Sequence, residues 1–451
     1  MKPAGRPSVA ALAAFAAPCL PLAGIGLPLV VYLPAYYAGP LGLPLSAVGL
    51  AFTLVRLVDI GFDPLLGGLM DRTRTRLGRF RPWLIASSPI LMLAAWRLFM
   101  PNPGVGVGYL WTWLAVVYVG FSMGSLSQTA WAAELSPDYD ERSRIYGWWQ
   151  TGNVFGMILI LLLPTIVILG FGLGETQGVQ AMGWFIILLM PATVALACWR
   201  VGEPVLTGPA ERGRISDYFA LMRRPSIGRL VLTDLLLGWA PGVTGILYLF
   251  YFDQIKHAPA GEANILLLVF FISGLLFGPV WWTLARRFGK HRALAVAALT
   301  MVAGEIAVLL IPFSSAPVAG AVMAFAGISY SAGPLLLRAM MADASDELRL
   351  ETGRDQTGLL YALLTATTKI GYALAGLSFV VLDLAGFHRG GGNGSLALFW
   401  LQAMFIGAPA LLSALAARLI LGHRLDAKRH AEILDALAAR APSSATSAPI
   451  R

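Results

Sequence analysis

The sequence predicts an all-α membrane protein in which twelve transmembrane helices form two six-helix bundles. Hydrophobic residues make up 57% of the 451 residues and charged residues only 13%, about half of the roughly 25% that is usual in soluble proteins. A bilayer-spanning helix needs about 20 mainly apolar residues, and the apolar content suffices for about twelve such helices. This composition excludes a soluble enzyme, a disordered chain and a coiled coil.

Twelve apolar runs are long enough to cross a bilayer, and a long polar connection separates the first six from the last six. We therefore expect a first bundle over 1–200, a central loop over 201–226, a second bundle over 227–423 and a tail over 424–451. Lys2 and Arg6 precede the first run as in a signal peptide, but this run continues past Val31, which favours a transmembrane helix. The expected spans are 9–37, 44–70, 82–101, 107–134, 145–171, 178–199, 227–255, 261–285, 291–312, 315–341, 357–385 and 393–422.

Lysine and arginine alternate between the connections. The first, third, fifth and ninth connections contain neither, and the seventh and eleventh contain only Lys256 and Arg389. The even-numbered connections are basic, as in Arg72–Arg81 and Arg286–Arg292. This pattern predicts a multi-pass protein of the inner (cytoplasmic) membrane with both termini in the cytoplasm. The net charge of +9 then reflects topology, so we expect the lipid bilayer as a partner and no nucleic acid.

A short pattern recurs at equivalent places in the two halves. Gly67-Gly68-Leu69-Met70-Asp71-Arg72 ends the second span, and Leu284-Ala285-Arg286-Arg287-Phe288-Gly289 ends the eighth span, six spans later. Two such copies in a chain of twelve spans resemble the major facilitator superfamily. The resemblance implies two six-helix bundles with a substrate cavity between them.

Three segments carry a closer resemblance. They are Arg56-Leu57-Val58-Asp59-Ile60-Gly61-Phe62-Asp63-Pro64 with the basic stretch that follows, Ala133-Glu134-Leu135-Ser136-Pro137-Asp138, and Glu351-Thr352-Gly353-Arg354-Asp355-Gln356 with Lys369 further on. Together they resemble the glycoside–pentoside–hexuronide:cation symporters, the melibiose-permease branch of the superfamily. The resemblance implies import of a glycoside or sugar derivative by alternating access, with Na⁺ or H⁺ as the coupling ion and no other cofactor.

The charges of the second span also indicate a cation site without the resemblance. Asp59 and Asp63 are four residues apart, so they share one face of a helix, and Arg56 lies nearly on that face. A charge near the middle of the membrane costs at least about 2.5–3.5 kcal/mol. Carboxylate oxygens at this spacing can chelate Na⁺ or share a proton. The alternative is a structural ion network in which Arg56 and Lys369 neutralise both aspartates.

The resemblance assigns further roles to this region. It places Asp59 and Asp63 at the cation-coordinating aspartates, with Ser122 of the fourth span as a third ligand. Lys369 lies near the middle of the eleventh span, too deep to reach the surface easily, and needs a carboxylate partner or a water-filled cavity. The matching lysine of the family faces the cation site, so we expect Lys369, with Arg56, to couple the two halves.

The sequence departs from the family where melibiose-type members bind sugar. Ala23 and Ser125 stand where those members have carboxylates, and Gln150 replaces an arginine of the fifth span. Melibiose itself is therefore not expected to be the substrate. A polar and aromatic set could bind another ring, with tryptophans as packing or interface anchors as the alternative. The candidate substrate-binding residues are Ser125, Gln128, Trp131, Trp149, Gln150, Asn153 and Tyr372.

Charged residues at the cytoplasmic ends are expected to form a salt-bridged gate that holds the outward-facing state. The candidates are Asp71, Arg72, Arg79, Glu141, Arg142, Asp343, Glu351 and Arg354. Three further intramembrane charges, Asp234, Glu305 and Arg338, have no motif that fixes their direction.

The function predicted by these patterns is cation-coupled secondary active symport. The glycines near 390–394 lack the strand and helix of a nucleotide site. Cys19 and Cys198 lack metal-ligand spacing, and we see no catalytic motif, so we do not expect an enzyme. The alternatives are the same cation-coupled fold carrying a lysolipid-like amphipathic solute, proton-driven efflux, and a non-transporting membrane sensor.

Overall fold

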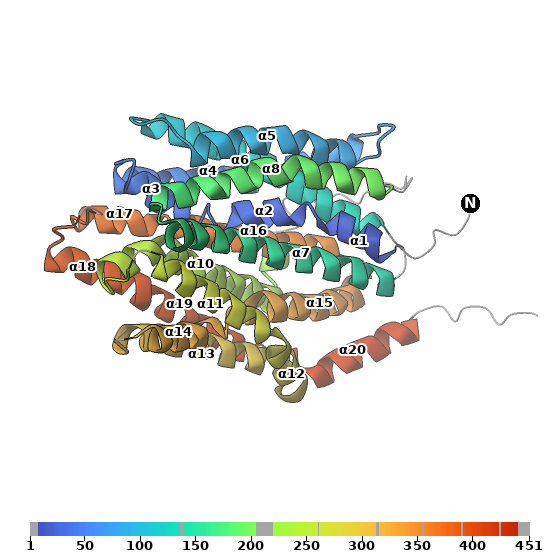
Figure 1. The fold of residues 1–451 in the computed structure, drawn as a ribbon. Helices are drawn as coiled ribbons and strands as arrows, with labels where there is room; N and C mark the ends of the chain where they lie inside the picture. Colours follow the sequence, from blue (N-terminus) through green and yellow to red (C-terminus); the bar gives the residue numbers. More distant parts are fainter. Residues whose placement is uncertain are drawn as a thin grey trace, which may run out of the picture.

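The computed structural model describes residues 8–135, 139–203, 220–259, 261–312, 315–353, 356–388, 391–423 and 425–440. This part of the chain contains 12 helices long and apolar enough to cross a membrane. Figure 1 shows them running along one common direction, with the first half of the chain in the upper part of the view and the second half in the lower part. The predicted all-α fold of twelve spans in two bundles is confirmed.

The first half supplies six spans, and proline interrupts the first of them. Its pieces are α1 (Val9–Ala16), α2 (Cys19–Gly26) and α3 (Tyr32–Ala38), and Pro18 and Pro28 lie at the two breaks. Proline lacks the amide hydrogen that an interior helical residue donates. The other spans are α4 (Leu45–Arg72), α5 (Arg81–Phe99), α6 (Val107–Glu134), α7 (Tyr139–Thr165) with the π-helix η1 (Ile166–Gly170), and α8 (Glu175–Arg200).

The second half repeats this arrangement with more interruptions. The tenth span was predicted to end near residue 341, but its helix continues to Thr352, because charged residues can extend a helix beyond the apolar layer. The elements are α10 (Pro225–Gln254), α11 (Glu262–Leu276), α12 (Gly278–Phe288), α13 (Lys290–Leu310), α14 (Ala316–Gly327), α15 (Ala332–Thr352), α16 (Thr357–Leu374), α17 (Leu377–Leu384), α18 (Ser395–Gln402), η2 (Ala403–Gly407) and α19 (Ala408–Leu421).

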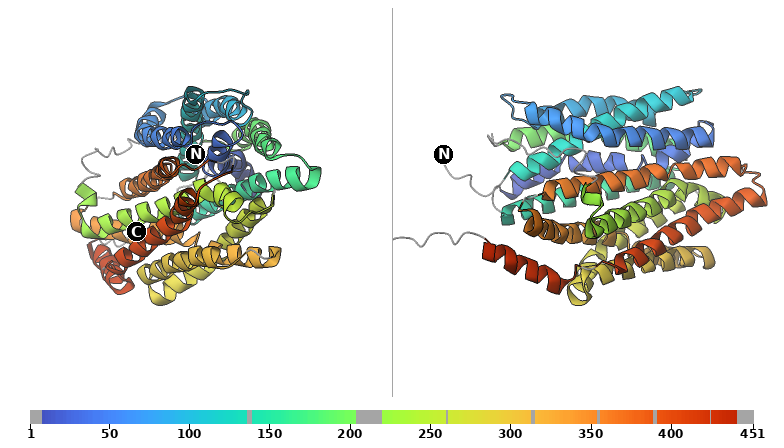
Figure 2. Two further views of the ribbon diagram at one scale, coloured as in Figure 1. Left: turned by 90° about the vertical axis from the view of Figure 1, so that its left-hand side faces the viewer. Right: turned by 180° about the vertical axis from the view of Figure 1, so that it is seen from behind.

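The two ends of the bundle differ in charge. The basic stretches Arg72–Arg81 and Arg286–Arg292 lie at the end we call the basic end; the opposite end is the far end. The first and last described residues also lie at the basic end, where α20 (Ala427–Arg440) packs against α15 and projects from the bundle (Figure 2). His430 of α20 contacts Asp346 of α15, with 2.9 Å between Nε2 and Oδ2.

The two halves meet at the far end and at mid-depth. α4 packs on α16 and α17, α11 on α7, and α10 on α3. Thr53 donates a hydrogen bond to the carbonyl oxygen of Ala373 (2.9 Å), and the Tyr32 hydroxyl donates one to Asn264 (2.9 Å). One buried apolar cluster runs from the first half into the far end of the second half, through residues such as Leu247 and Phe252. These contacts close the far end between the halves.

Glycines allow the closest approach across this interface. A Cβ added at Gly49 of α4 would lie 2.7 Å from Cβ of Phe379 and nearer still to the carbonyl oxygen of Gly376. A Cβ at Gly376 would overlap the Thr53 hydroxyl and the backbone of Gly49. Because neither glycine has room for a side chain, α4 and α17 are in backbone contact here.

Candidate functional site

The deepest charged cluster joins the two halves. Lys369 of α16 donates hydrogen bonds to both carboxylates of α4: its Nζ lies 2.8 Å from Oδ2 of Asp59, and it also bonds Oδ2 of Asp63. The side chain of Asp59 is only 3% exposed. The four-residue spacing places both aspartates toward α16, as a helical face requires. One lysine therefore bonds two carboxylates that the other half of the molecule supplies, and it balances only one of their two negative charges.

The remaining oxygens of this cluster suit a hard cation. The Ser122 hydroxyl of α6 donates to Oδ1 of Asp59 at 2.8 Å, so this residue is where the family resemblance requires it. Oδ1 of Asp63 is buried without a hydrogen-bond partner in the part of the chain that the structure describes. Two carboxylates, one of them with an unsatisfied oxygen, and a hydroxyl form an oxygen-rich set of the kind that hard cations prefer.

Arg56 lies beside the cluster, in contact with aromatic rings. Its guanidinium carbon lies 5.5 Å from the ring centre of Tyr118 and 5.3 Å from that of Tyr372. No carboxylate among the described residues forms an ion pair with it. The alternative in which Arg56 neutralises the aspartates therefore does not match this geometry; two cation–π contacts hold Arg56 instead.

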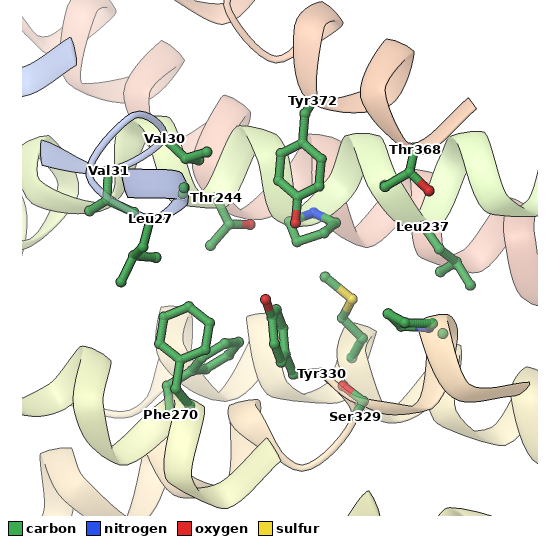
Figure 3. A pocket seen from close by; sticks show the side chains of 18 of the residues that line it. Leu27, Val30, Val31, Leu237, Thr244, Phe270, Ser329, Tyr330, Thr368 and Tyr372 are labelled. Carbon is green, nitrogen blue, oxygen red and sulfur yellow. The ribbon is translucent and has the colours of Figure 1, made fainter. Parts of the chain in front are cut away.

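A cavity of about 540 Å³ lies between the halves and reaches the ion cluster. Asp59, Arg56 and Lys369 line it, as do Ala23 and Asn153 of the first half. Figure 3 shows the hydroxyl ends of Tyr372 and Tyr330 pointing toward each other across the space. The rest of the wall is mostly apolar and aromatic, including Leu27, Val30, Leu237, Tyr248, Phe270, Phe271 and Met301. Such a wall with a few polar groups is typical of a small-molecule site.

Two of the seven candidate substrate-binding residues, Asn153 and Tyr372, line this cavity, whereas five lie outside its wall. Gln150 is exposed on α7, and Ser125 and Trp149 are partly buried elsewhere. Gln128 donates from Nε2 to the carbonyl oxygen of Phe15 at 3.0 Å. Trp131 is fully buried and packs edge-on against the Phe15 ring, with centroids 5.3 Å apart. In this arrangement Gln128 and Trp131 tie α6 to α1 rather than face a solute.

The buried position of Trp131 leads to a stability prediction. Trp131→Ala should destabilise the fold by about 3–5 kcal/mol, as expected for removing a buried aromatic ring, and should leave solute affinity of the folded fraction within about twofold. Trp149 is only partly buried, so Trp149→Ala serves as the matched control and should lose less stability. Thermal unfolding in detergent, combined with a binding titration, checks both parts. A selective loss of affinity at unchanged melting temperature would restore Trp131 to the solute site.

Three candidate gate residues, Asp343, Glu351 and Arg79, have partners within their own half. Lys290 bonds both oxygens of Asp343 at 2.7 Å, and Arg224 pairs with Glu351. Nε of Arg79 donates to the carbonyl oxygen of Met70 at 3.3 Å, and Arg72 is exposed. The side chains of Asp71, Glu141, Arg142 and Arg354 lie outside the described residues.

Several cavity residues were not selected from the sequence. The aromatic residues Tyr118, Phe270 and Tyr330 resemble lipid-facing or packing aromatics in an apolar run, and nothing in the sequence distinguishes them. Asp234 and Glu305 are intramembrane charges whose direction no motif fixes, and the structure places both, together with Arg338, on the cavity wall. Their direction depends on the rotation of α10 and α13, which packing determines.

Twelve membrane-crossing helices in two halves, with charges shared across a central cavity, define a membrane transporter of the major facilitator fold. The fold is similar to that of the nucleoside transporter NupG, with a TM-score of 0.66 and 13% identity over 92% of this chain and 100% of that chain. Residues 14–427 match the family described as MFS/sugar transport protein. The chain belongs to this family.

Characterised relatives agree with the resemblance to glycoside–pentoside–hexuronide symporters. The chain is 23% identical over 413 residues to the isoprimeverose transporter of Lactiplantibacillus pentosus, covering 88% of this chain and 84% of that protein. It is 24% identical over 408 residues to the lactose permease of Lactobacillus delbrueckii subsp. bulgaricus, covering 85% of this chain and 64% of that protein. These relatives are transporters and not enzymes, and the predicted family is confirmed.

Proposed function

We propose that the protein is a cation-coupled symporter that imports a glycoside or sugar derivative by alternating access. The observation that carries the proposal is the contact of Lys369 with both Asp59 and Asp63 at the wall of the cavity. A coupling cation, Na⁺ or H⁺, would compete with the lysine for these carboxylates. Cation binding then frees Lys369 from the first half and changes the cavity wall that the solute touches, which links the two binding events.

The proposal includes an orientation in the inner membrane. The alternation of basic connections supports a cytoplasmic basic end with both termini inside the cell. Exposed apolar side chains such as Val58, Leu188 and Leu384 would face lipid. In this orientation, the closed far end and the pairing of Asp343 and Glu351 within their own half support an inward-facing state. We propose that the gate residues pair across the halves in the outward-facing state.

Uptake into vesicles tests this function. Purified protein reconstituted into proteoliposomes should accumulate isoprimeverose or lactose, the sugars named for its relatives, when an inward Na⁺ or H⁺ gradient is imposed. Collapsing the gradient should reduce uptake to equilibration. Protein-free vesicles provide the background. Uptake that is independent of both the Na⁺ and the H⁺ gradient would contradict cation coupling. Failure to transport any sugar of a wider panel of glycosides would contradict the solute class.

The apolar character of the wall also suits a second solute class, an amphipathic solute with an acyl chain. Leu27, Val30 and Phe270 could cover an acyl chain, and the polar candidate residues Gln128 and Gln150 lie outside the wall. The same vesicles distinguish the two classes, because an amphipathic substrate such as a lysolipid would compete with sugar uptake at micromolar concentration. We favour the sugar class, since the relatives are named for sugars and the wall retains carboxylates and phenol hydroxyls that an acyl chain cannot satisfy.

A further inference from the structure

Two acidic residues of the second half have open oxygens on the cavity wall. Glu305 of α13 is 7% exposed, and its only hydrogen bond among the described residues comes from the Thr244 hydroxyl to Oε1 at a long 3.3 Å. Oε2 has no partner there. Asp234 of α10 is 8% exposed and accepts bonds on Oδ2 from Thr367 (2.6 Å) and Thr368 (2.9 Å) of α16, whereas its Oδ1 accepts none from described residues. Both residues line the cavity.

A purely structural role explains these groups poorly. A carboxylate in the membrane interior is costly unless it is paired or bonded. Arg338 lies on the same wall as Asp234, yet each of the two acidic residues leaves one oxygen without a hydrogen-bond partner among the described residues. An open oxygen of this kind binds hydroxyl groups well, because it accepts the hydrogen bond that a sugar hydroxyl donates.

The two carboxylates lie at different depths of the cavity. Glu305 bonds Thr244, which is ten residues after Asp234 on α10, and a helical rise of about 1.5 Å per residue separates these positions by about 15 Å. The level of Lys369 lies between them, since Gly238 of α10 is packed against Thr368. A solute that touches both ends must therefore be elongated and must pass the ion cluster.

We propose that Asp234 and Glu305 are the solute-binding carboxylates of this chain and hold the two ends of a hydroxylated solute of at least two rings, such as a disaccharide. Tyr330 and Tyr372, whose hydroxyl groups point toward each other across the space (Figure 3), lie beside the rings of the solute. The second half thus supplies the carboxyl groups that Ala23 and Ser125 do not provide in the first half. The inference rests on the proposed function and specifies its solute.

The same segment of α16 serves both sites. Thr367 and Thr368 bond Asp234, and the next residue, Lys369, bonds Asp59 and Asp63. When a cation displaces Lys369, this turn of α16 is released from α4, and the hydroxyls that hold Asp234 can move with it. Solute affinity then depends on cation occupancy through three consecutive residues.

Calorimetric titration of purified protein tests the proposal, with isoprimeverose, lactose and their component monosaccharides as probes. Glu305→Gln and Asp234→Asn should each weaken disaccharide binding about ten- to hundredfold, the effect of losing one hydrogen bond to a charged group. Both substitutions keep an oxygen for the threonine hydroxyls, so the fold is retained. Asp383→Asn, a carboxylate of α17 outside the cavity, is the control and should bind as the wild type does.

Two further measurements distinguish a loss of solute contacts from a general structural effect of the substitutions. Cation affinity measured without sugar should be unchanged in Glu305→Gln, and the wild type should bind the disaccharides more tightly than their component monosaccharides. Unchanged disaccharide affinity in both variants, or equal affinity for one-ring and two-ring sugars, would overturn the inference while leaving sugar symport intact. Absence of binding of every probe to the wild type would overturn the proposed solute class and this inference with it.

Discussion

Asp59→Asn is expected to abolish cation-driven solute accumulation while leaving the protein folded in the membrane. Asp59 is nearly inaccessible and accepts hydrogen bonds from both Ser122 and Lys369. An asparagine can keep the bond from the serine, but it removes one of two negative charges from the site. A monovalent cation and Lys369 then no longer compete for two carboxylates, and the differential affinity that couples cation to solute is lost.

Proteoliposome uptake against a gradient measures this effect. We expect accumulation to fall at least a hundredfold, to the level of equilibration, because coupling requires the missing charge; this corresponds to about 2.7 kcal/mol. Solute exchange across the membrane without any gradient should persist, which shows that the cavity still opens and closes. Ser122→Ala, which removes one neutral ligand, is the graded comparison and should retain partial accumulation. Full accumulation by Asp59→Asn would place the cation site elsewhere.

The second large effect is expected at the closed far end. Gly49→Ala should block turnover, because its Cβ would overlap the backbone of Gly376 and the side chain of Phe379. Backbone atoms cannot move aside as a flexible side chain can, so α4 and α17 must separate. The substitution therefore disfavours the state in which the far end is closed and shifts the population toward the outward-facing state.

Labelling measures this shift directly. Val31 lines the cavity and is 2% exposed, and Cys19 and Cys198 are buried. A Val31→Cys reporter should react faster with an impermeant maleimide from outside the cell when Gly49→Ala is present. Gly320→Ala on α14, which has open space for a Cβ, is the matched control. If the Gly49→Ala variant takes up solute at the wild-type rate and Cys at position 31 stays unlabelled, the contact between Gly49 and Gly376 does not close the transporter.

The ion cluster could be predicted from the sequence because its determinants are local. A four-residue spacing fixes Asp59 and Asp63 on one face of α4 wherever that helix lies. The depth of Lys369 in the membrane leaves it few possible partners other than such a pair. The family resemblance then supplied Ser122, which no spacing within α6 would have selected.

The solute wall could not be predicted in the same way. Whether Gln128 and Trp131 face the cavity or α1 depends on the rotation of α6 about its axis, and packing against Phe15 sets that rotation. Glu305 has no other charged residue near it in α13, where charge otherwise occurs only in the first turn, so its direction follows only from the position of α13. The breaks at Pro18 and Pro28 have a local cause, whereas their effect on the path of the first span depends on tertiary contacts.

Reciprocal binding measured on one purified preparation tests coupling at Asp59 and Asp63 most directly. The solute dissociation constant is titrated with and without the cation, and the cation dissociation constant with and without the solute. For each ligand, the ratio of interest is its dissociation constant without the other ligand divided by that with it. Coupling through one site requires the two ratios to be equal and greater than one in the wild type. Both ratios should become one in Asp59→Asn. Ratios of one in the wild type, or equal coupling in the variant, would contradict a cation site at these aspartates.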